Sequence, residues 1–370
     1  MADCAAVVII GGGIQGLSLA YHLALHGMNR VCLLEEQTLG SGSSGKSASV
    51  IGHAFQSERC LALTLWSFQA LLRFEEELGA TPDYEPIGCL LLGDEQEAVG
   101  FRQRHTLLRE RGVTCSLIGP DEIDRLTPGL NLDGIELGLH LPADGVLDPH
   151  MMMMAYAKQA RRRGVRILEG VEATSLELHH GRVTGVQTTG GLISTDWVVN
   201  AAGARAREVA SWVGLDLPIT NLKRHVVVTG PVETYRCNIP FTYEAGPAWY
   251  MRREGPGVLL GMGKTATHAG DVAVDQSYLL ELIDYSIHRA PPLAEAGMMT
   301  SWAGLRPVTP DDDPILGPVD RVGGYVNDCG WGGIGVMNAP AAGMALAEWL
   351  CHGRATTINV DHFGAERFEP

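Results

Sequence analysis

Apolar residues near the N-terminus form short uninterrupted runs separated by a helix-spaced segment. The run Ala6–Ile10 predicts a strand buried on both faces, because it has no polar side and stops at a group of glycines. Helical spacing follows over Gln15–Leu25 and ends near Gly27, and the next short apolar run is Val31–Leu34. Strand, helix and strand in this order predict one βαβ unit with a parallel sheet.

The rest of the chain alternates between helical and strand patterns, with no internal repeat. Helices are expected over Leu61–Leu78, Phe101–Arg111, Pro120–Leu126, Met151–Arg163 and Ala339–Leu350. Strands are expected at Gly88–Leu92, Val165–Leu168, Trp197–Asn200, Val226–Thr229, Trp249–Met251 and Val258–Gly261. A hairpin is expected to join Ala173–Leu178 to Val183–Thr188. The later strands are assigned to a second sheet.

Composition and charge narrow the class of protein. The formal net charge of −15 argues against a nucleic-acid partner, because phosphate contacts need clustered Lys and Arg. The N-terminus has no basic segment and its apolar run is short, so we expect neither a signal peptide nor a membrane span. The eight cysteines form no CxxC pair. Reduced thiols, and therefore a cytoplasmic location, are expected.

A glycine-rich turn after the first strand matches the pattern GxGxxG with Gly11, Gly13 and Gly16. The first glycine permits the tight turn, the second lets the backbone approach a pyrophosphate, and the third allows close packing of helix on strand. Glu35 closes the next strand about 20 residues further on, where a carboxylate can bind ribose hydroxyls. The turn therefore predicts a dinucleotide site. Further candidate contacts are Ile14, Gln15 and Glu36.

A second glycine-rich segment, Gly40–Ser47, matches the P-loop pattern GxxxxGK[ST] letter for letter. A P-loop must leave a buried strand directly, whereas residues 36–39 intervene here, and no apolar strand ending in a magnesium-binding Asp is evident. We therefore expect the loop to contact the same dinucleotide. Its candidate contacts are Gly42, Ser43, Ser44, Lys46, Ser47 and Ala48.

Two later blocks contain small residues that suit contact with a cofactor. Val198–Ala204 ends in Ala201 and Gly203, which suits close approach of backbone to a cofactor. Trp302–Asp311 is followed by the glycine turn Gly330–Gly335, which can aim the last helix at a group that becomes negative. The candidate contacts in and next to these blocks are Ala201, Gly203, Gly304, Arg306, Gly332, Gly333, Ile334, Gly335 and Val336, and Ala173 at the start of the hairpin is a further candidate.

Taken in order, these blocks resemble the D-amino-acid-oxidase-like superfamily of FAD enzymes. The group includes glycine oxidase, sarcosine oxidases, D-arginine dehydrogenase and the β subunits of dye-linked proline dehydrogenases. The resemblance implies an α/β (α+β) fold with a Rossmann-type FAD-binding domain and a smaller antiparallel-sheet substrate domain. We place the first domain at residues 1–83, 145–217 and 303–370, and the second at residues 84–144 and 218–302.

The resemblance also implies roles for residues of the substrate domain. Arg306 corresponds to the arginine that binds the substrate carboxylate, and Tyr250 to the tyrosine that assists it. Arg224 or His225 is a further candidate for the same task.

Departures from the family pattern concern the flavin. Gly304 stands where some relatives attach flavin to a cysteine, and Lys46 stands where others carry a linking histidine, so non-covalent FAD is expected. Leu259 stands where oxidases place a lysine that activates oxygen, and Lys264 comes several residues late. A glutamate that serves a cationic substrate in one relative is absent near Gly88, which argues against a strongly cationic substrate.

The function implied is oxidation of the C–N bond of an amino acid or N-alkyl amino acid, by hydride transfer to flavin N5 and hydrolysis of the imine. Alternatives are an oxidase that produces hydrogen peroxide, a 2-hydroxy acid dehydrogenase, and an FAD-holding subunit of a heteromeric dehydrogenase. The acceptor is a quinone, a partner subunit or oxygen, and the chain forms homo- or hetero-oligomers or acts alone. The sequence has no HExxH or GxSxG motif, and the run Asp311–Asp313 is expected to be solvated, so no metal site is predicted.

Overall fold

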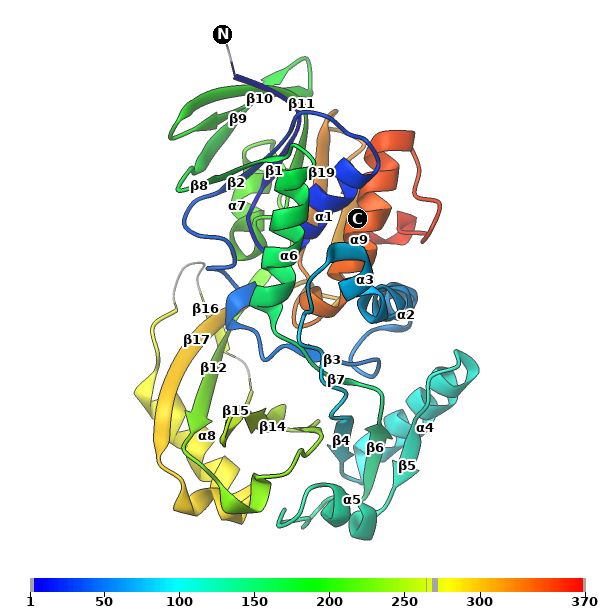
Figure 1. Ribbon diagram of the computed structural model, residues 1–370, viewed down its shortest axis with the longest axis vertical. Coiled ribbons are helices and arrows are strands. Elements are labelled where there is room, and N and C mark those ends of the chain that lie inside the picture. The colour runs from blue at the N-terminus through cyan, green and yellow to red at the C-terminus, as the bar shows by residue number, and fades with distance from the viewer. Residues whose placement is uncertain (1–2, 264, 268–271, 369–370) are drawn as a thin grey trace.

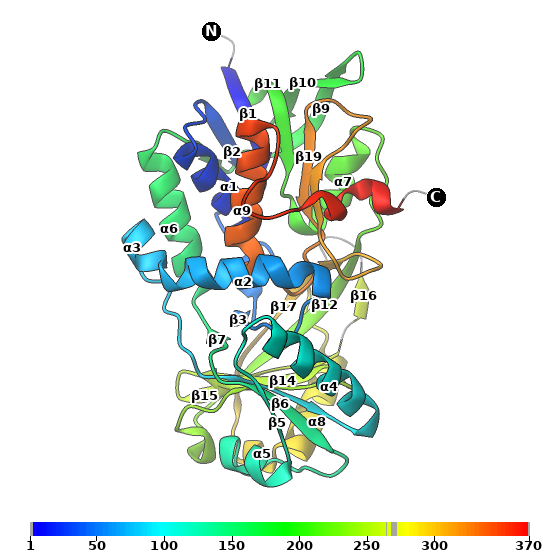
Figure 2. The ribbon, with the colours of Figure 1, turned by 90° about the vertical axis from the view of Figure 1, so that its right-hand side faces the viewer.

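The computed structural model describes residues 3–263, 265–267 and 272–368, and its two lobes follow one another along the long axis (Figure 1). One lobe contains the first sheet with both chain ends, and the other contains the second sheet. The helix α2 (Glu58–Leu72) lies across the molecule between them, as Figure 2 shows. No helix in the described ranges has both the length and the apolar character needed to cross a bilayer.

The first sheet has a parallel centre that contains the predicted βαβ unit. β1 (Asp3–Ile10) pairs in parallel with β2 (Val31–Glu35) on one side and with β11 (Gly191–Asn200) on the other. The strand order is β18-β19-β11-β1-β2-β8, and the β9–β10 hairpin extends β11. The other strands are β8 (Arg166–Glu169), β9 (Ala173–His179), β10 (Arg182–Thr188), β18 (Ile315–Pro318) and β19 (Tyr325–Cys329).

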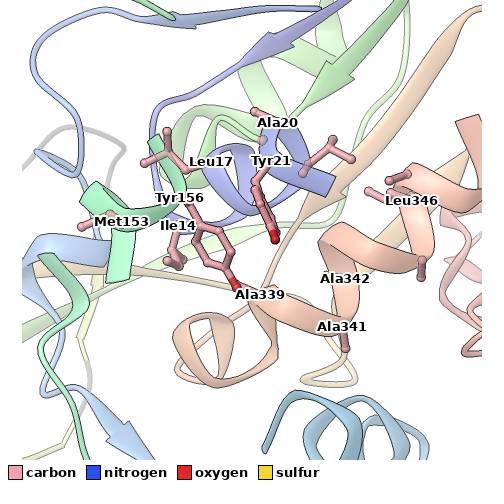
Figure 3. Close-up of a cluster of buried hydrophobic side chains, with 14 of the residues drawn as sticks. Ile14, Leu17, Ala20, Tyr21, Met153, Tyr156, Ala339, Ala341, Ala342 and Leu346 are labelled. Carbon is pink, nitrogen blue, oxygen red and sulfur yellow. The ribbon is translucent and has the colours of Figure 1, made fainter. Parts of the chain in front are cut away.

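Both faces of this sheet are covered, which explains the uninterrupted apolar runs. Alternate residues of β1 belong to different clusters: Val7 and Ile9 pack with α1, α6 and α9, whereas Val8 and Ile10 pack on the side of α7. Figure 3 shows the first cluster, where side chains of the three helices meet. The three helices of this cluster are α1 (Ile14–Leu25), α6 (Pro149–Arg162) and α9 (Gly335–His352), and α7 (Ala206–Ser211) covers the other face of the sheet.

The second sheet is mostly antiparallel, and its order is β16-β12-β15-β14-β13-β4-β6-β5 with β17 on the free side of β12. Its strands are β4 (Cys89–Gly93), β5 (Ser116–Ile118), β6 (Leu137–Leu141), β12 (Thr220–Thr229), β13 (Phe241–Glu244), β14 (Trp249–Glu254), β15 (Gly257–Gly261), β16 (Thr265–Thr267) and β17 (Met298–Val308). Its helices are α4 (Glu95–Glu110), α5 (Pro120–Leu126) and α8 (Gln276–Arg289). The short pair β3 (Val50–Ile51) and β7 (Gly145–Val146) lies between the lobes (Figure 1).

The predicted fold class is confirmed, and the differences lie in individual elements. The helix expected over Leu61–Leu78 is two helices, α2 and α3 (Phe74–Leu78), which meet at Arg73. α4 begins before the expected Phe101, because Asp94 and Glu97 form a capping box that starts the helix at Glu95. The last helix begins at Gly335, before Pro340, although proline is unfavourable inside a helix.

The long strand β17 was not expected, because its sequence contains Gly304 and Pro307, residue types that are rare in strands. β17 pairs with β12 alone among the described strands. An edge strand tolerates a proline, because the missing N–H can lie on the side that has no neighbouring strand. β17 runs across residue 303, where we placed a domain boundary; the boundaries themselves stay a prediction.

Candidate active site

A cavity of about 610 Å³ lies where the two lobes meet. Its walls come from the turn after β1, the loop of residues 41–49, the end of β11, the turn after β19, and strands β12, β13, β14 and β17. This volume is within the usual range of about 300–1,000 Å³ for ligand and cofactor sites. Segments that are far apart in the sequence therefore meet at one site.

The glycine turn after β1 has the close contacts that the motif predicts. Gly11 has a φ of +118°, and a side chain there would overlap the carbonyl of Ala201 at the end of β11. A side chain at Gly16 would overlap the carbonyl of Gly11. Gly16 does not line the cavity, so this glycine serves helix packing, while Gly11 and Gly13 border the site.

The loop of residues 40–47 folds onto this turn and is not a P-loop. The amide of Gly40 donates to the carbonyl of Gly12 (3.0 Å), and the Ser44 hydroxyl accepts from the amide of Ile14 (3.1 Å) at the start of α1. Glu35 is buried beside them: its Oε2 accepts from the Gly12 amide and its Oε1 from the Gln37 amide, both at 2.9 Å. The carboxylate therefore has a fixed position at the cavity wall.

Arg205 pairs with three acidic side chains at the same end of the cavity. The sequence analysis did not identify this arginine. Its guanidinium pairs with Glu36, with Glu172 (2.9 Å) and with Glu208 (2.8 Å). Hydrogen bonding to Glu208 is the main cause that raises the pKa of Arg205. Glu36, a predicted cofactor contact, is thus already held by Arg205. Arg205 follows the Asn-Ala-Ala-Gly-Ala block directly, which is the signal that could have indicated it.

At the opposite end, one row of residues crosses the second sheet and faces the cavity. Tyr243 pairs with Tyr250, Tyr250 with Gly261, and Gly261 with Val226. Paired residues in an antiparallel sheet project from the same face. Tyr243, Tyr250 and Val226 line the cavity. Burial raises the pKa of the Tyr250 hydroxyl, which therefore stays protonated and can donate a hydrogen bond.

Two arginines stand next to this row. In the β12–β17 ladder, Leu222 pairs with Arg306 and Arg224 pairs with Gly304. Arg224 and Arg306 are therefore diagonal neighbours on one face, with Cα atoms about 7–8 Å apart. Both line the cavity. Burial is the main cause that lowers the pKa of Arg306, and the nearby charge of Arg224 adds to it; a guanidinium nevertheless keeps its charge.

His225, the other candidate of this strand, does not line the cavity. Its buried ring accepts a hydrogen bond at Nε2 from the Asp275 amide (3.0 Å) and packs against Tyr278. Successive residues of a strand point to opposite faces, so Arg224 and His225 cannot both face the same site. The structure thus places Arg224, and not His225, beside Arg306.

Glycines give Arg306 and Lys46 the room that they occupy. A side chain at Gly333 would lie 2.6 Å from Arg306 Cζ, so the guanidinium packs against the backbone of the turn after β19. A side chain at Gly304 would lie 3.0 Å from Lys46 Cβ. The Gly332 amide donates to the carbonyl of Pro307 (2.7 Å), which ties this turn to β17.

Asp328, at the end of β19, is a buried carboxyl that the sequence analysis did not single out. Its Oδ1 accepts from the indole N–H of Trp331 (2.7 Å), while its Oδ2 is buried without a partner in the described ranges. Burial raises the pKa of Asp328 to about 7, although the bond from Trp331 opposes this shift. Asp328 lines the cavity as a group that changes charge near neutral pH.

The structure brings the predicted cofactor contacts together. Apart from Gly16, every one of them lines the cavity, from Gly11 to Val336. Leu259 is buried in β15 and does not line it, and Lys264 lies outside the described residues. His53 is buried as well, with Nδ1 2.6 Å from Asp144 Oδ1, away from the cavity wall.

The prediction that the acidic run Asp311–Asp313 is solvated is wrong for Asp313. This residue is fully buried and pairs with Arg59 (2.6 Å). Asp311 pairs with Arg59 and Arg367, both at 3.0 Å. These ion pairs hold the loop in place. Within the described ranges, no group of three or more His, Cys, Asp or Glu side chains could hold a metal ion.

Comparison with known proteins gives a match over almost the whole chain. The family described as FAD dependent oxidoreductase matches residues 6–349. Dimethylglycine dehydrogenase of Rattus norvegicus is 32% identical over 95% of this chain and 43% of its own length. Sarcosine oxidase subunit beta of Rhodobacter capsulatus is 27% identical over 98% of this chain and 88% of its own. The chain therefore spans less than half the length of the mitochondrial relative.

Solved structures share the fold. L-proline dehydrogenase from P. horikoshii superposes with a TM-score of 0.92 at 28% identity, covering 100% of this chain and 99% of the other. Glycine oxidase from Geobacillus kaustophilus has a TM-score of 0.88 at 24% identity, covering 99% of each chain. The second comparison concerns the fold alone.

The residues present fit an FAD molecule. The glycine turn and the N-terminus of α1 offer amides to a pyrophosphate, and Lys46 lines the same cavity. Buried polar atoms that have no partner in the described part of the chain border the remaining space: Gln15 Oε1, Arg224 Nη1, Arg306 Nε and Asp328 Oδ2. Unpaired buried polar atoms are unfavourable, so a bound group that pairs with them is expected at this site.

Proposed function

We propose, since the chain belongs to the family of FAD-dependent oxidoreductases, that it oxidises the carbon–nitrogen bond of an amino acid or N-alkyl amino acid. The observation that carries the proposal is the position of Arg306 and Tyr250 in the same cavity as the dinucleotide turn. A guanidinium beside a protonated phenol binds a carboxylate well. The relatives named for dimethylglycine, sarcosine and proline support an amine that carries such a group.

In this proposal, the protein's residues position the substrate and exclude water. Arg306 holds the carboxylate, and the Tyr250 hydroxyl donates to it, so that the α carbon has one orientation. Positioning of this kind supplies a large share of a rate enhancement. FAD, when bound, accepts the hydride. The substrate amine must be unprotonated, and no basic side chain at the sheet end of the cavity is assigned to remove its proton.

The test is anaerobic mixing of the FAD-loaded protein with amino, N-methylamino, imino and 2-hydroxy acids. Loss of the oxidised flavin absorbance with the amines supports the proposal. Bleaching by the 2-hydroxy acids alone would contradict the proposal, because the protein would then oxidise a carbon–oxygen bond and not a carbon–nitrogen bond.

A second candidate is an FAD-holding subunit of a heteromeric enzyme. The match over 88% of a protein named sarcosine oxidase subunit beta favours it. Activity of the purified chain separates an independent enzyme from such a subunit. A subunit would bind FAD, but substrate would bleach its flavin only after the partner is added.

A further inference from the structure

The sheet end of the cavity contains the guanidinium groups of Arg224 and Arg306. Residues in the described ranges form no hydrogen bond or ion pair with either guanidinium group, and Arg224 Nη1 and Arg306 Nε are buried. Their strands keep them on one face as diagonal neighbours. Two like charges held close together in a partly buried site repel each other, which is unfavourable unless anions compensate them.

The acidic side chains of the cavity wall do not provide this compensation. Four of them line the cavity, and none forms an ion pair with Arg224 or Arg306 in the described ranges. Glu35 accepts from backbone amides, Glu36 and Glu172 pair with Arg205, and Asp328 accepts from Trp331. The cavity walls around the two arginines include Tyr243, Tyr250, Phe241 and Val226, which carry no negative charge, and the charge of Asp312 acts on Arg306 more weakly than that of Arg224 does.

FAD would supply its pyrophosphate charges at the other end of the site. There the amides of the glycine turn and the start of α1 border the space that a pyrophosphate would occupy. The carboxylate of a simple amino acid neutralises one guanidinium and leaves the other buried and uncompensated.

We propose that the substrate is an amine with two carboxylates, one bound by Arg306 with Tyr250 and the other by Arg224. This inference rests on the proposed function, and it names the substrate class of the same site. Gly304, which pairs with Arg224 across the ladder, leaves room for the side chain of Lys46, which packs over this part of the sheet. The aromatic rings of Phe241 and Tyr243 contact the carbon chain between the two acidic groups.

The test uses the FAD-loaded protein and ligands that cannot be oxidised, so that binding is measured apart from turnover. Propionate and succinate form a pair that differs by one carboxylate, and glutarate adds a longer spacing. Binding is followed by calorimetry and by the visible difference spectrum of the flavin. We expect the better dicarboxylate to bind about 10- to 100-fold more tightly than propionate, as a charged hydrogen-bonded contact predicts.

Variants assign the second carboxylate. Arg224→Gln should abolish the preference for the dicarboxylate and change propionate binding little, whereas Arg224→Lys should keep part of the preference. Arg253→Gln is the matched control, because Arg253 lies on β14 outside the cavity and bonds to Asn238. Flavin content confirms that each variant is folded.

Equal binding of propionate and both dicarboxylates would overturn the inference. So would an equal loss of both ligands in Arg224→Gln, because Arg224 would then share one carboxylate with Arg306. Failure of the proposed function is a separate result: if no amine bleaches the flavin but dicarboxylates bind preferentially through Arg224, the two-carboxylate site stands and the chemistry is different.

Discussion

Tyr250 lies directly opposite Gly261 across the β14–β15 pair, and its ring occupies the space that a side chain at residue 261 would need. We predict that Gly261→Ala moves the Tyr250 hydroxyl and lowers kcat/KM about 10- to 100-fold, with FAD still bound. Steady-state kinetics and flavin content measure the two effects. Gly297→Ala, at a position with open space for a Cβ, is the control and should be neutral. Unchanged kinetics in Gly261→Ala would mean that Tyr250 has no role in binding.

Arg306→Ala should raise KM strongly and leave FAD in place. Loss of a charge-assisted bidentate contact costs about 2–5 kcal/mol when the partner charge stays buried. Substrate titration of the variant by flavin bleaching measures the change, and Arg253→Ala serves as its control. Normal binding in Arg306→Ala would show that the substrate has no carboxylate at this position.

FAD should be released intact by acid precipitation, giving a yellow supernatant and a colourless pellet. Gly304 and Lys46 offer neither a thiol nor an imidazole for a covalent link. Cys329 lines the cavity, but burial raises the pKa of its thiol, which makes the thiol a poor nucleophile. Flavin that stays with the pellet after denaturation would contradict this prediction.

Asp328 should make stability depend on pH in one direction. Its folded-state pKa of about 7 lies above that of an unfolded Asp, so the folded state keeps a proton that the unfolded chain releases. The protonated Asp328 stabilises the folded state fully below about pH 4. Between about pH 4 and 7 the free energy of unfolding falls by about 1.4 kcal/mol per pH unit, until this contribution is lost. Urea unfolding of the FAD-free protein measures it. Asp328→Asn should lack this slope, and parallel pH profiles for the two proteins would refute the assignment.

Oxygen should be a poor electron acceptor. A fixed cation beside the flavin stabilises the superoxide-like charge that forms during reoxidation. Leu259, which the resemblance to the family sets against the lysine of oxidases, is buried in β15. Stopped-flow mixing of the reduced protein with oxygen should therefore show slow reoxidation, while an artificial dye or a quinone reacts quickly. If reoxidation in air keeps pace with turnover, the protein is an oxidase, and Lys46→Met then tests whether Lys46 supplies the charge.

The sequence was informative where local physics determines the structure. The turn from Gly11 to Gly16 and the apolar runs of β1 and β2 have contacts specific enough to predict from spacing alone. The Gly40–Ser47 loop could be interpreted only together with its neighbouring segments, since its pattern taken alone predicts a P-loop.

The residues that the sequence did not indicate depend on pairing between distant segments. Tyr243 faces the cavity because of its register with Tyr250, and no local pattern marks it. β17 was missed since glycine and proline obscure its strand character, although it carries Arg306. Asp328 has a raised pKa because it is buried, and its burial depends on the turn after β19, which the local sequence does not reveal.

The contact between α1 and α9 joins segments that lie far apart in the sequence. Ser18 donates to the carbonyl of Ala339 (2.7 Å), 321 residues away, and Gly343 lies so close to Ser18 that it has no room for a side chain. During synthesis, the βαβ unit that contains α1 therefore waits for this packing partner until α9 has left the ribosome. Contacts of such long sequence separation slow folding and expose apolar surface meanwhile. Production of this protein should accordingly depend on chaperone supply and growth temperature more than that of a protein with mainly local contacts.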